Sequence, residues 1–266
     1  MTSPRMPRRY RDDEHAPGLA ALSPAPMFAA FYGEFTSTPE IPHEQDHFSL
    51  FVAYSDAMGW LTDDNHSGLW GMNDAGGNSY GDGPRAWFQV EVDPVPAGRP
   101  LPVLPFLQAA VAVNERLGIG PAEKVLMLLP VHRLGPRSPH AVATMRTAGW
   151  FAPLAPEARV SAEVQLALGQ GGSREALRRT AADFVRLEQS VVTSLRVTGS
   201  AAAPVTPFDD SFWGGPAGAT LTVHGSLAAW TPDAVGWVAQ ALAECASAHG
   251  VSDLLVTVTR HEHERA

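Results

Sequence analysis

The sequence of 266 residues contains a single cysteine, Cys245, so no disulfide can form within the chain. Cysteine usage of this kind fits a reducing compartment, and we expect a cytoplasmic protein. No apolar run approaches the ~20 residues that cross a bilayer, and the N-terminus lacks the apolar segment of a secretory signal. The sequence therefore predicts no membrane partner.

Lysine is almost absent as well, since Lys124 is the only one among 19 basic residues. Schiff-base or pyridoxal chemistry would therefore depend on this one side chain. The formal net charge of −9 disfavours a surface for duplex nucleic acid, because phosphate binding depends on clustered Lys and Arg. The chain also lacks a G-x-x-x-x-G-K loop, a G-x-G-x-x-G loop and a cysteine pair, so we predict no nucleic-acid partner and no cofactor.

The most regular feature of the sequence is a repeated pattern of strand, helix and strand. In its clearest copy, residues 219–225 alternate between apolar and polar side chains with the period of a strand. Thr231 then offers an N-cap, an apolar face repeats at helical spacing up to a C-terminal cap at Gly250, and residues 251–259 return as a strand. Cys245 lies on that apolar face, which predicts a core residue rather than a nucleophile.

An earlier copy comprises a strand at 159–167, a helix after Ser173 and a strand at 191–198. Together the two copies give β-α-β-β-α-β, the pattern of a ferredoxin-like domain, and we predict this α+β architecture for a C-terminal half at residues 151–266. The last six residues, from His261 onward, are expected to be a fraying end.

We predict a related α/β N-terminal half over residues 27–150, preceded by a disordered tail at 1–26. Its expected elements are strands at 27–35, 47–54, 86–92 and 125–131, a long loop at 55–85 and a helix near 103–117. Polar residues occupy one side of several of these strands. If the two halves oppose these polar sides, their sheets enclose a cavity that contains water.

Residues 42–50, PHEQDHFSL, contain His43, Glu44 and His47 in the H-E-x-x-H spacing of zinc peptidases. Such a site needs both histidines one helical turn apart on the same face. A proline directly precedes the motif, and apolar residues alternate over 47–54 as in a strand, which would hold the histidines apart. A zinc hydrolase is therefore the weaker alternative, and we expect a polar loop that leads into a strand.

Two other motifs are incomplete. GNSYG (77–81) has the G-x-S-x-G pattern of a nucleophile elbow, but the strand before it and the helix after it are missing, which predicts that Ser79 is an ordinary loop serine. Residues 63–74 place oxygen-bearing side chains at the spacing of an EF-hand calcium loop, with Gly68 at the sharp turn. Asp74 replaces the usual glutamate and no helix can follow, so a loop rich in Asx turns is the alternative to calcium binding.

The remaining candidates lie in the loop 55–85 and on the polar sides of the strands. An ordered loop of this length is usually functional, and its mixture of aromatic and polar groups suits a lid over a ligand. We predict Glu91 as general base, with His224 and His66 as further acid–base groups. The predicted substrate-binding residues are Arg85, Trp87, Gln89, Glu163, Ser194, Arg196 and Trp213.

The sequence thus favours a cofactor-independent enzyme that uses acid–base chemistry on a small organic substrate, for example a condensation, cyclisation or isomerisation in specialised metabolism. The main alternative is a non-catalytic acidic binding module, such as an inhibitor, immunity or assembly factor, and a homodimer fits either class. An enclosed cavity containing Glu91 would favour the enzyme. An exposed apolar patch at Trp60, Trp70 or Trp213 would favour the binding module.

Overall fold

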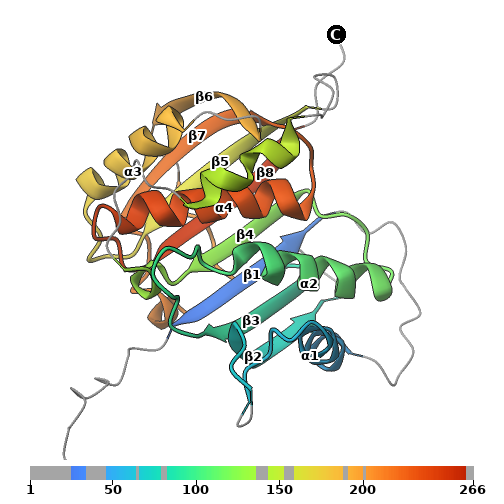
Figure 1. The fold of residues 1–266 in the computed structure, drawn as a ribbon. Coiled ribbons are helices and arrows are strands. Elements are labelled where there is room, and N and C mark those ends of the chain that lie inside the picture. The colour runs from blue at the N-terminus through green and yellow to red at the C-terminus, as the bar shows by residue number, and fades with distance from the viewer. Residues whose placement is uncertain are drawn as a thin grey trace, which may run out of the picture.

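The computed structural model shows an α+β protein with one eight-stranded antiparallel sheet and four α-helices on one of its faces (Figure 1), so the expected α+β class is confirmed. The structure describes residues 25–33, 46–63, 66–78, 83–135, 143–152, 159–187, 191–199 and 202–261. The strands are β1 (Pro26–Tyr32), β2 (Trp70–Gly77), β3 (Ala86–Val92), β4 (Lys124–Leu129), β5 (Val160–Leu168), β6 (Val192–Gly199), β7 (Ala219–Leu227) and β8 (Leu254–His261). The helices are α1 (His47–Ala57), α2 (Val103–Arg116), α3 (Arg174–Arg186) and α4 (Pro232–Ser247), with short 3-10 segments η1 (Val131–Arg133), η2 (Ala143–Phe151) and η4 (Asp210–Phe212).

The strand order is β2-β3-β1-β4-β8-β5-β7-β6, and all neighbouring pairs are antiparallel. Each half of the chain places its last strand at the centre of the sheet and its second strand at an edge. The halves join through β4 and β8, which pair from Lys124 opposite Thr259 to Leu129 opposite Leu254. The expectation of two opposed sheets around a cavity is therefore wrong, because the halves join edge to edge in a single sheet.

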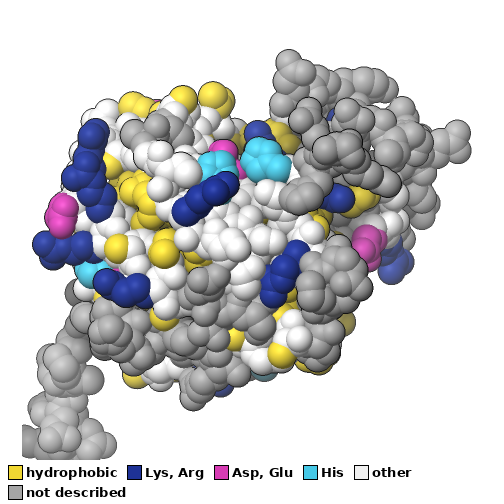
Figure 2. Space-filling model, turned by 90° about the horizontal axis from the view of Figure 1, so that it is seen from above, with side chains coloured by type: hydrophobic (Ala, Val, Ile, Leu, Met, Phe, Trp, Pro, Cys, Tyr) yellow, Lys and Arg dark blue, Asp and Glu magenta, His cyan; other side chains and the backbone are white. Residues whose placement is uncertain are grey.

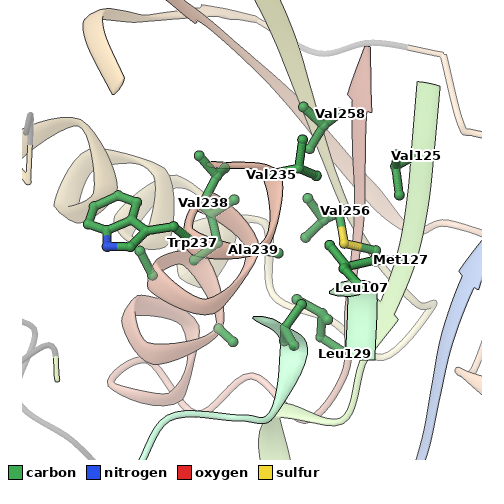
Figure 3. Packing of buried hydrophobic residues seen from close by; sticks show 14 of the residues in the cluster. Leu107, Val125, Met127, Leu129, Val235, Trp237, Val238, Ala239, Val256 and Val258 are labelled. Atoms are coloured by element: carbon green, nitrogen blue, oxygen red, sulfur yellow. The ribbon is translucent and has the colours of Figure 1, made fainter. Parts of the chain in front are cut away.

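The two central strands are apolar on both faces, which explains why they lie inside the sheet. On the helix side, Met127 of β4 and Val256 of β8 point into the core shared with α4 (Figure 3). On the other side, Leu126, Leu128 and Leu255 belong to a second buried cluster. Strands that bury both faces exclude water from the whole ladder and favour a central position.

Residues 47–54, expected as a strand, form most of helix α1. The Asp46 carboxylate caps this helix by accepting a hydrogen bond from the Ser49 backbone N–H at 2.7 Å. Its buried residues follow one another at a helical spacing of four: His47, Phe51 and Ser55. The strand prediction is wrong because apolar residues lie around much of the helix. The sequence of this segment therefore fits both the alternation of a strand and the spacing of a helix. The N-cap at Asp46 favours the helix.

The long loop expected at 55–85 is interrupted by β2, which pairs with β3. Trp70 at the start of β2 is fully buried, with its ring centroid 6.3 Å from that of Phe51 and 6.0 Å from that of Phe106. The middle of the expected lid is thus part of the N-terminal core. No local pattern signals this strand, because its stability comes from packing against α1 and α2.

Helices α2 and α4 lie side by side across the junction of the two halves (Figure 1). Gly236 permits their close approach, because a Cβ atom at this position would lie 3.0 Å from Leu104 Cδ2 and 3.4 Å from Leu104 Cα. The seam between these helices is therefore narrow at Gly236.

The connection between the halves, residues 130–159, packs on α4 where it is described. Trp237 Nε1 donates a hydrogen bond to the Thr144 carbonyl at 2.9 Å, and Ser247 Oγ donates one to the Gly135 carbonyl at 3.0 Å. The fully buried Glu244 carboxylate accepts hydrogen bonds from the backbone N–H and the hydroxyl of Thr144. These three polar groups of α4 therefore find their partners in the connection.

The sheet face without helices is partly covered by the connection between β6 and β7. Phe208 packs edge-on against Phe28 of β1, with 4.7 Å between the ring centroids, and Trp213 is only 5% exposed. Both belong to the second cluster, which lies over β1, β4 and their neighbours. Further along the same face, the side chains of Glu163 and His224 remain 33% and 32% exposed.

The chain ends differ in part from expectation. The disordered tail expected at 1–26 lies mostly outside the described residues, but Pro26 already belongs to β1. His261, expected in a fraying end, is the last residue of β8, and residues 262–266 are not described. Among the helices that the structure describes, none combines the length and apolarity needed to span a membrane.

Both edge strands are irregular. The pairing of β2 with β3 shifts its register between Met72 and Asp74, and the pairing of β6 with β7 shifts between Thr193 and Arg196. Ser194, inside the second irregularity, has a φ of 57°, in the left-handed region. Bulges of this kind bend an edge strand and interrupt its hydrogen-bond ladder.

The helical assignment of α1 predicts a large difference between two of its phenylalanines. Phe51→Ala should lower the free energy of unfolding by about 3–5 kcal/mol, because the ring is fully buried against Phe88 and Phe106. Phe48→Ala, on the same helix but 40% exposed, is the matched control and should cost less than about 1 kcal/mol. Urea unfolding followed by circular dichroism measures both, and equal losses would contradict the assignment.

Candidate metal centre

The sequence-predicted site residues of the strands lie on the sheet face without helices, but in two separate groups. One group lies on or beside β3 and comprises Arg85, Trp87, Gln89 and Glu91, while the other lies on β5, β6 and β7 and comprises Glu163, Ser194, Arg196 and His224. Strand β3, with Glu91, and strand β7, with His224, are five strand spacings apart, which corresponds to about 24 Å at ~4.8 Å per spacing. The structure therefore does not bring Glu91 and His224 into one small-molecule site.

The Glu91 carboxylate has structural contacts. It accepts a hydrogen bond from the Ala25 backbone N–H at 2.7 Å and lies 3.2 Å from Arg133 Nη2. These contacts tie the start of β1 and the η1 segment to β3. Glu91 lines neither of two pockets formed by described residues, one beside α2 and α4 and one at the end of β5, so neither is the enclosed cavity that would favour a catalytic base.

The other residues of the β3 group are also occupied by local contacts. Arg85 Nε donates a hydrogen bond to the Gly33 carbonyl at 2.6 Å. The Trp87 ring stacks on Phe28 with 6.0 Å between centroids, and Gln89 lies half-buried on the same strand. This part of the sheet face is built as a packed surface rather than as an open site.

Two predicted site residues lie elsewhere. His66 is exposed in the turn before β2, with its Nε2 atom 3.3 Å from the Gly59 carbonyl. Trp213 is buried, and its Nε1 donates to the Asp210 carboxylate at 3.3 Å. Neither lies on the strands that present Glu163 and His224, although Trp213 helps to cover the neighbouring part of the same sheet face.

Two members of the second group, Glu163 and His224, form a compact cluster with His261, which was expected in a fraying end. Glu163 Oε2 lies 3.7 Å from His224 Nε2 and 3.8 Å from His261 Nε2. The three side chains come from the neighbouring strands β7, β5 and β8, so the register of the sheet fixes their spacing. Figure 2 shows two histidine side chains beside an acidic one at the molecular surface, next to Lys or Arg side chains.

A simple signal could have identified His261. Along β8, Val256 and Val258 face the helices, so Thr257, Thr259 and His261 face the other side by the two-residue period of a strand. Continuing this period past residue 259 places His261 on the same face as Glu163. What the sequence could not supply is the pairing of β8 with β5.

Two imidazole nitrogens and one carboxylate oxygen are a common donor set for zinc and for iron(II). The three candidate ligand atoms lie within 4.8 Å of one another. Tetrahedral zinc with bonds of about 2.0–2.1 Å needs ligand atoms about 3.3 Å apart, so small side-chain rotations would close the site. The partial exposure of all three side chains permits these rotations and leaves the solvent side open for a further ligand.

The H-E-x-x-H motif does not extend this centre. His43 and Glu44 lie outside the described residues, and His47 opens helix α1 with its ring buried 6.0 Å from the ring of Phe88. Its Nε2 atom has no hydrogen-bond partner among the described residues. His47 is therefore a core residue of the N-terminal half.

The calcium-loop spacing at 63–74 is divided between a turn and a strand. Asp63 accepts a hydrogen bond from the His66 backbone N–H at 2.8 Å, as in an Asx turn, whereas Asp74 belongs to the edge strand β2. Asn65 and Ser79, which belonged to the calcium and nucleophile motifs, lie outside the described residues. The turn supports the Asx-turn alternative for the part of the loop that is described.

The tryptophans named for a partner surface are not exposed together. Trp70 is fully buried, Trp213 is 5% exposed, and Trp60 packs on Trp70 with 5.7 Å between ring centroids.

Cys245 is buried in α4, and burial raises the pKa of its thiol to about 12, so the prediction of a core cysteine is confirmed.

Comparisons with protein families, with curated proteins and with solved structures gave no match for this chain. What the chain binds is therefore inferred from its own residues.

Burial of His47 predicts a pH-dependent loss of stability. Burial lowers the pKa of His47, and the negative charge of Asp46 opposes this effect without cancelling it. The unfolded chain then binds a proton more readily than the folded chain, so stability falls as the pH drops below about 6.5. His47→Leu removes this contribution, and relative to the wild type it should gain stability from pH ~8 to ~5, by at most about 1.4 kcal/mol per pH unit.

His132 provides the control of opposite sign. A hydrogen bond to Asp253 raises the pKa of His132, so its stabilising contribution is present below about pH 6.5 and is lost as the pH rises through the folded pKa. His132→Gln should therefore lose stability relative to the wild type at low pH. Thermal unfolding across the pH range measures both variants, and the same sign for both would refute the assignment.

Proposed function

We propose that this chain binds a divalent transition-metal ion, with zinc as the first candidate, through Glu163, His224 and His261, and uses it as an enzyme on a small anionic molecule. One observation carries the proposal: a carboxylate oxygen lies within 3.8 Å of two imidazole nitrogens from neighbouring strands. The proposal keeps the expected small-molecule enzyme but replaces a cofactor-free base at Glu91 by a metal centre in the C-terminal half.

The three donor residues determine which ion the protein can hold and what chemistry that ion would supply. A divalent ion bound there would supply Lewis acidity and lower the pKa of a bound water. Glu163 lies between the two histidines and contributes the negative charge that holds a cation, while the imidazoles contribute neutral nitrogen donors. Because the strands of a sheet are rigid, these donors keep their spacing while the solvent side stays free for a substrate.

Arg196 supports an anionic substrate. It is the cross-strand neighbour of His224, which places the two Cβ atoms about 4.5–5.5 Å apart. Its side chain is exposed and makes no hydrogen bond or ion pair with another described residue. A guanidinium group binds carboxylate or phosphate through two hydrogen bonds, so a substrate that reaches both the ion and Arg196 would carry such a group.

We further propose that the halves are ferredoxin-like units in tandem. Both follow the order β-α-β-β-α-β, and in both the strands lie in the order last, first, third, second from the centre of the sheet. On this proposal the sheet faces without helices have different roles in the two units. The open face of the N-terminal unit is covered by the β6–β7 connection, and that of the C-terminal unit carries the metal centre.

The metal centre predicts selective loss of zinc affinity in three variants. Glu163→Gln, His224→Gln and His261→Gln should each weaken Zn²⁺ binding to the full chain by at least about tenfold, because each removes one of three donors. Isothermal titration of tag-free protein measures the affinity. His66→Gln, in an exposed turn before β2, is the matched control and should bind as the wild type does.

The catalytic part is tested with the zinc-loaded protein and an anionic substrate, bis(p-nitrophenyl) phosphate, with the uncharged ester p-nitrophenyl acetate for comparison. Hydrolysis above background that is lost in Glu163→Gln and reduced in Arg196→Gln for the phosphate would support it. Unchanged zinc affinity in Glu163→Gln would refute the centre, and zinc binding without turnover of bis(p-nitrophenyl) phosphate would refute the enzyme.

A further inference from the structure

We infer that a pocket at the seam between α2 and α4 binds a small, uncharged and largely apolar molecule that donates one hydrogen bond. The inference is independent of the proposed metal centre, which lies on the opposite face of the sheet. The pocket has a volume of ≈ 350 Å³, within the range of small-molecule sites.

The walls of this pocket are apolar and come from four elements of both halves. They include Phe31 of β1, Leu107 and Val111 of α2, Val125 of β4 and Val235 of α4. Three of these side chains are visible in the packed core beside the seam (Figure 3). Trp230 forms a further wall, and a hydrogen bond of 2.6 Å from its Nε1 to the Ala122 carbonyl fixes the ring.

Asn114 is the feature that indicates a ligand. It lines the pocket, is 5% exposed, and its Oδ1 atom has no hydrogen-bond partner among the described residues. Buried amide oxygens without a partner are uncommon, because the lost contact with water is not replaced. Oδ1 is itself shielded from water, so a rotation of the amide would be needed to turn it toward the pocket, where an N–H or O–H group of a bound molecule would supply the missing donor.

Another part of α4 shows how the chain satisfies polar groups without a ligand. There the connection between the halves covers α4 and pairs with Trp237, Glu244 and Ser247. At Asn114 no described segment performs this role, and the space stays open. The unpaired acceptor and the unfilled volume therefore occur together.

The charges around the pocket exclude anions. Its lining contains one charged side chain, the exposed Glu115, and no Lys or Arg. A carboxylate or phosphate would find no cationic partner and would face the charge of Glu115. A flat apolar molecule with a hydroxyl or N–H group satisfies both the walls and Asn114.

The inference is tested with 2-naphthol and naphthalene as probes, which share the same rings but differ in the hydroxyl donor. Saturation-transfer NMR titrations on the full chain, with EDTA present, should show saturable binding of both and a preference of about 3–10-fold for 2-naphthol. Asn114→Leu should reduce this preference to less than about twofold while retaining naphthalene binding, because the leucine replaces the unpaired acceptor by an apolar group.

Two further variants make the test specific. Val111→Trp should abolish binding of both probes by filling the pocket. Gln108→Leu changes an exposed amide on the same helix outside the lining and should keep the wild-type preference. Glu163→Gln should also leave probe binding unchanged, which separates this site from the metal centre. Absence of saturable binding to the wild type, equal affinity for the two probes, or the same loss in Gln108→Leu as in Asn114→Leu would overturn the inference.

Discussion

The antiparallel pairing of β4 with β8 is the constraint on which the other features of this protein depend. It joins the two halves edge to edge, and it requires two strands that are apolar on both faces. The same pairing brings α2 beside α4 and so creates the seam that contains Asn114. Along its other edge β8 pairs with β5, which brings His261 beside Glu163 on the sheet face without helices. The seam site therefore follows from the junction itself, and the metal centre from the pairings within the C-terminal half.

Sequence reasoning succeeded where structure is set locally. Ser173 and Thr231 cap α3 and α4 by accepting hydrogen bonds from the N–H groups three residues on, and Gly250 has the positive φ expected after α4. It failed where tertiary contacts decide. The cap at Asp46 and the burial of Phe51 select a helix in an ambiguous apolar segment, and the burial of Trp70 orders a strand inside an apparent loop.

The candidate site was predicted only in part for a related reason. Alternation along a strand identifies which residues share a face, and it correctly separated Glu163 and His224 from the helix-facing residues of their strands. Alternation does not give the order of strands, so it groups Glu91 with His224 although five strand spacings separate β3 from β7. The role of Asn114 in the seam pocket could not be predicted, because the sequence of an apolar helix does not show whether a buried amide has a hydrogen-bond partner.

The bulges in β2 and β6 have a consequence for self-association. A regular edge strand offers a row of free backbone N–H and C=O groups on which another chain can add a strand. Here the register shifts at Met72 and Thr193, with the left-handed Ser194, break that row at both ends of the sheet. Growth of the sheet into dimers or fibrils through its edges is thereby disfavoured, and two copies of this chain would have to meet through side-chain surfaces instead.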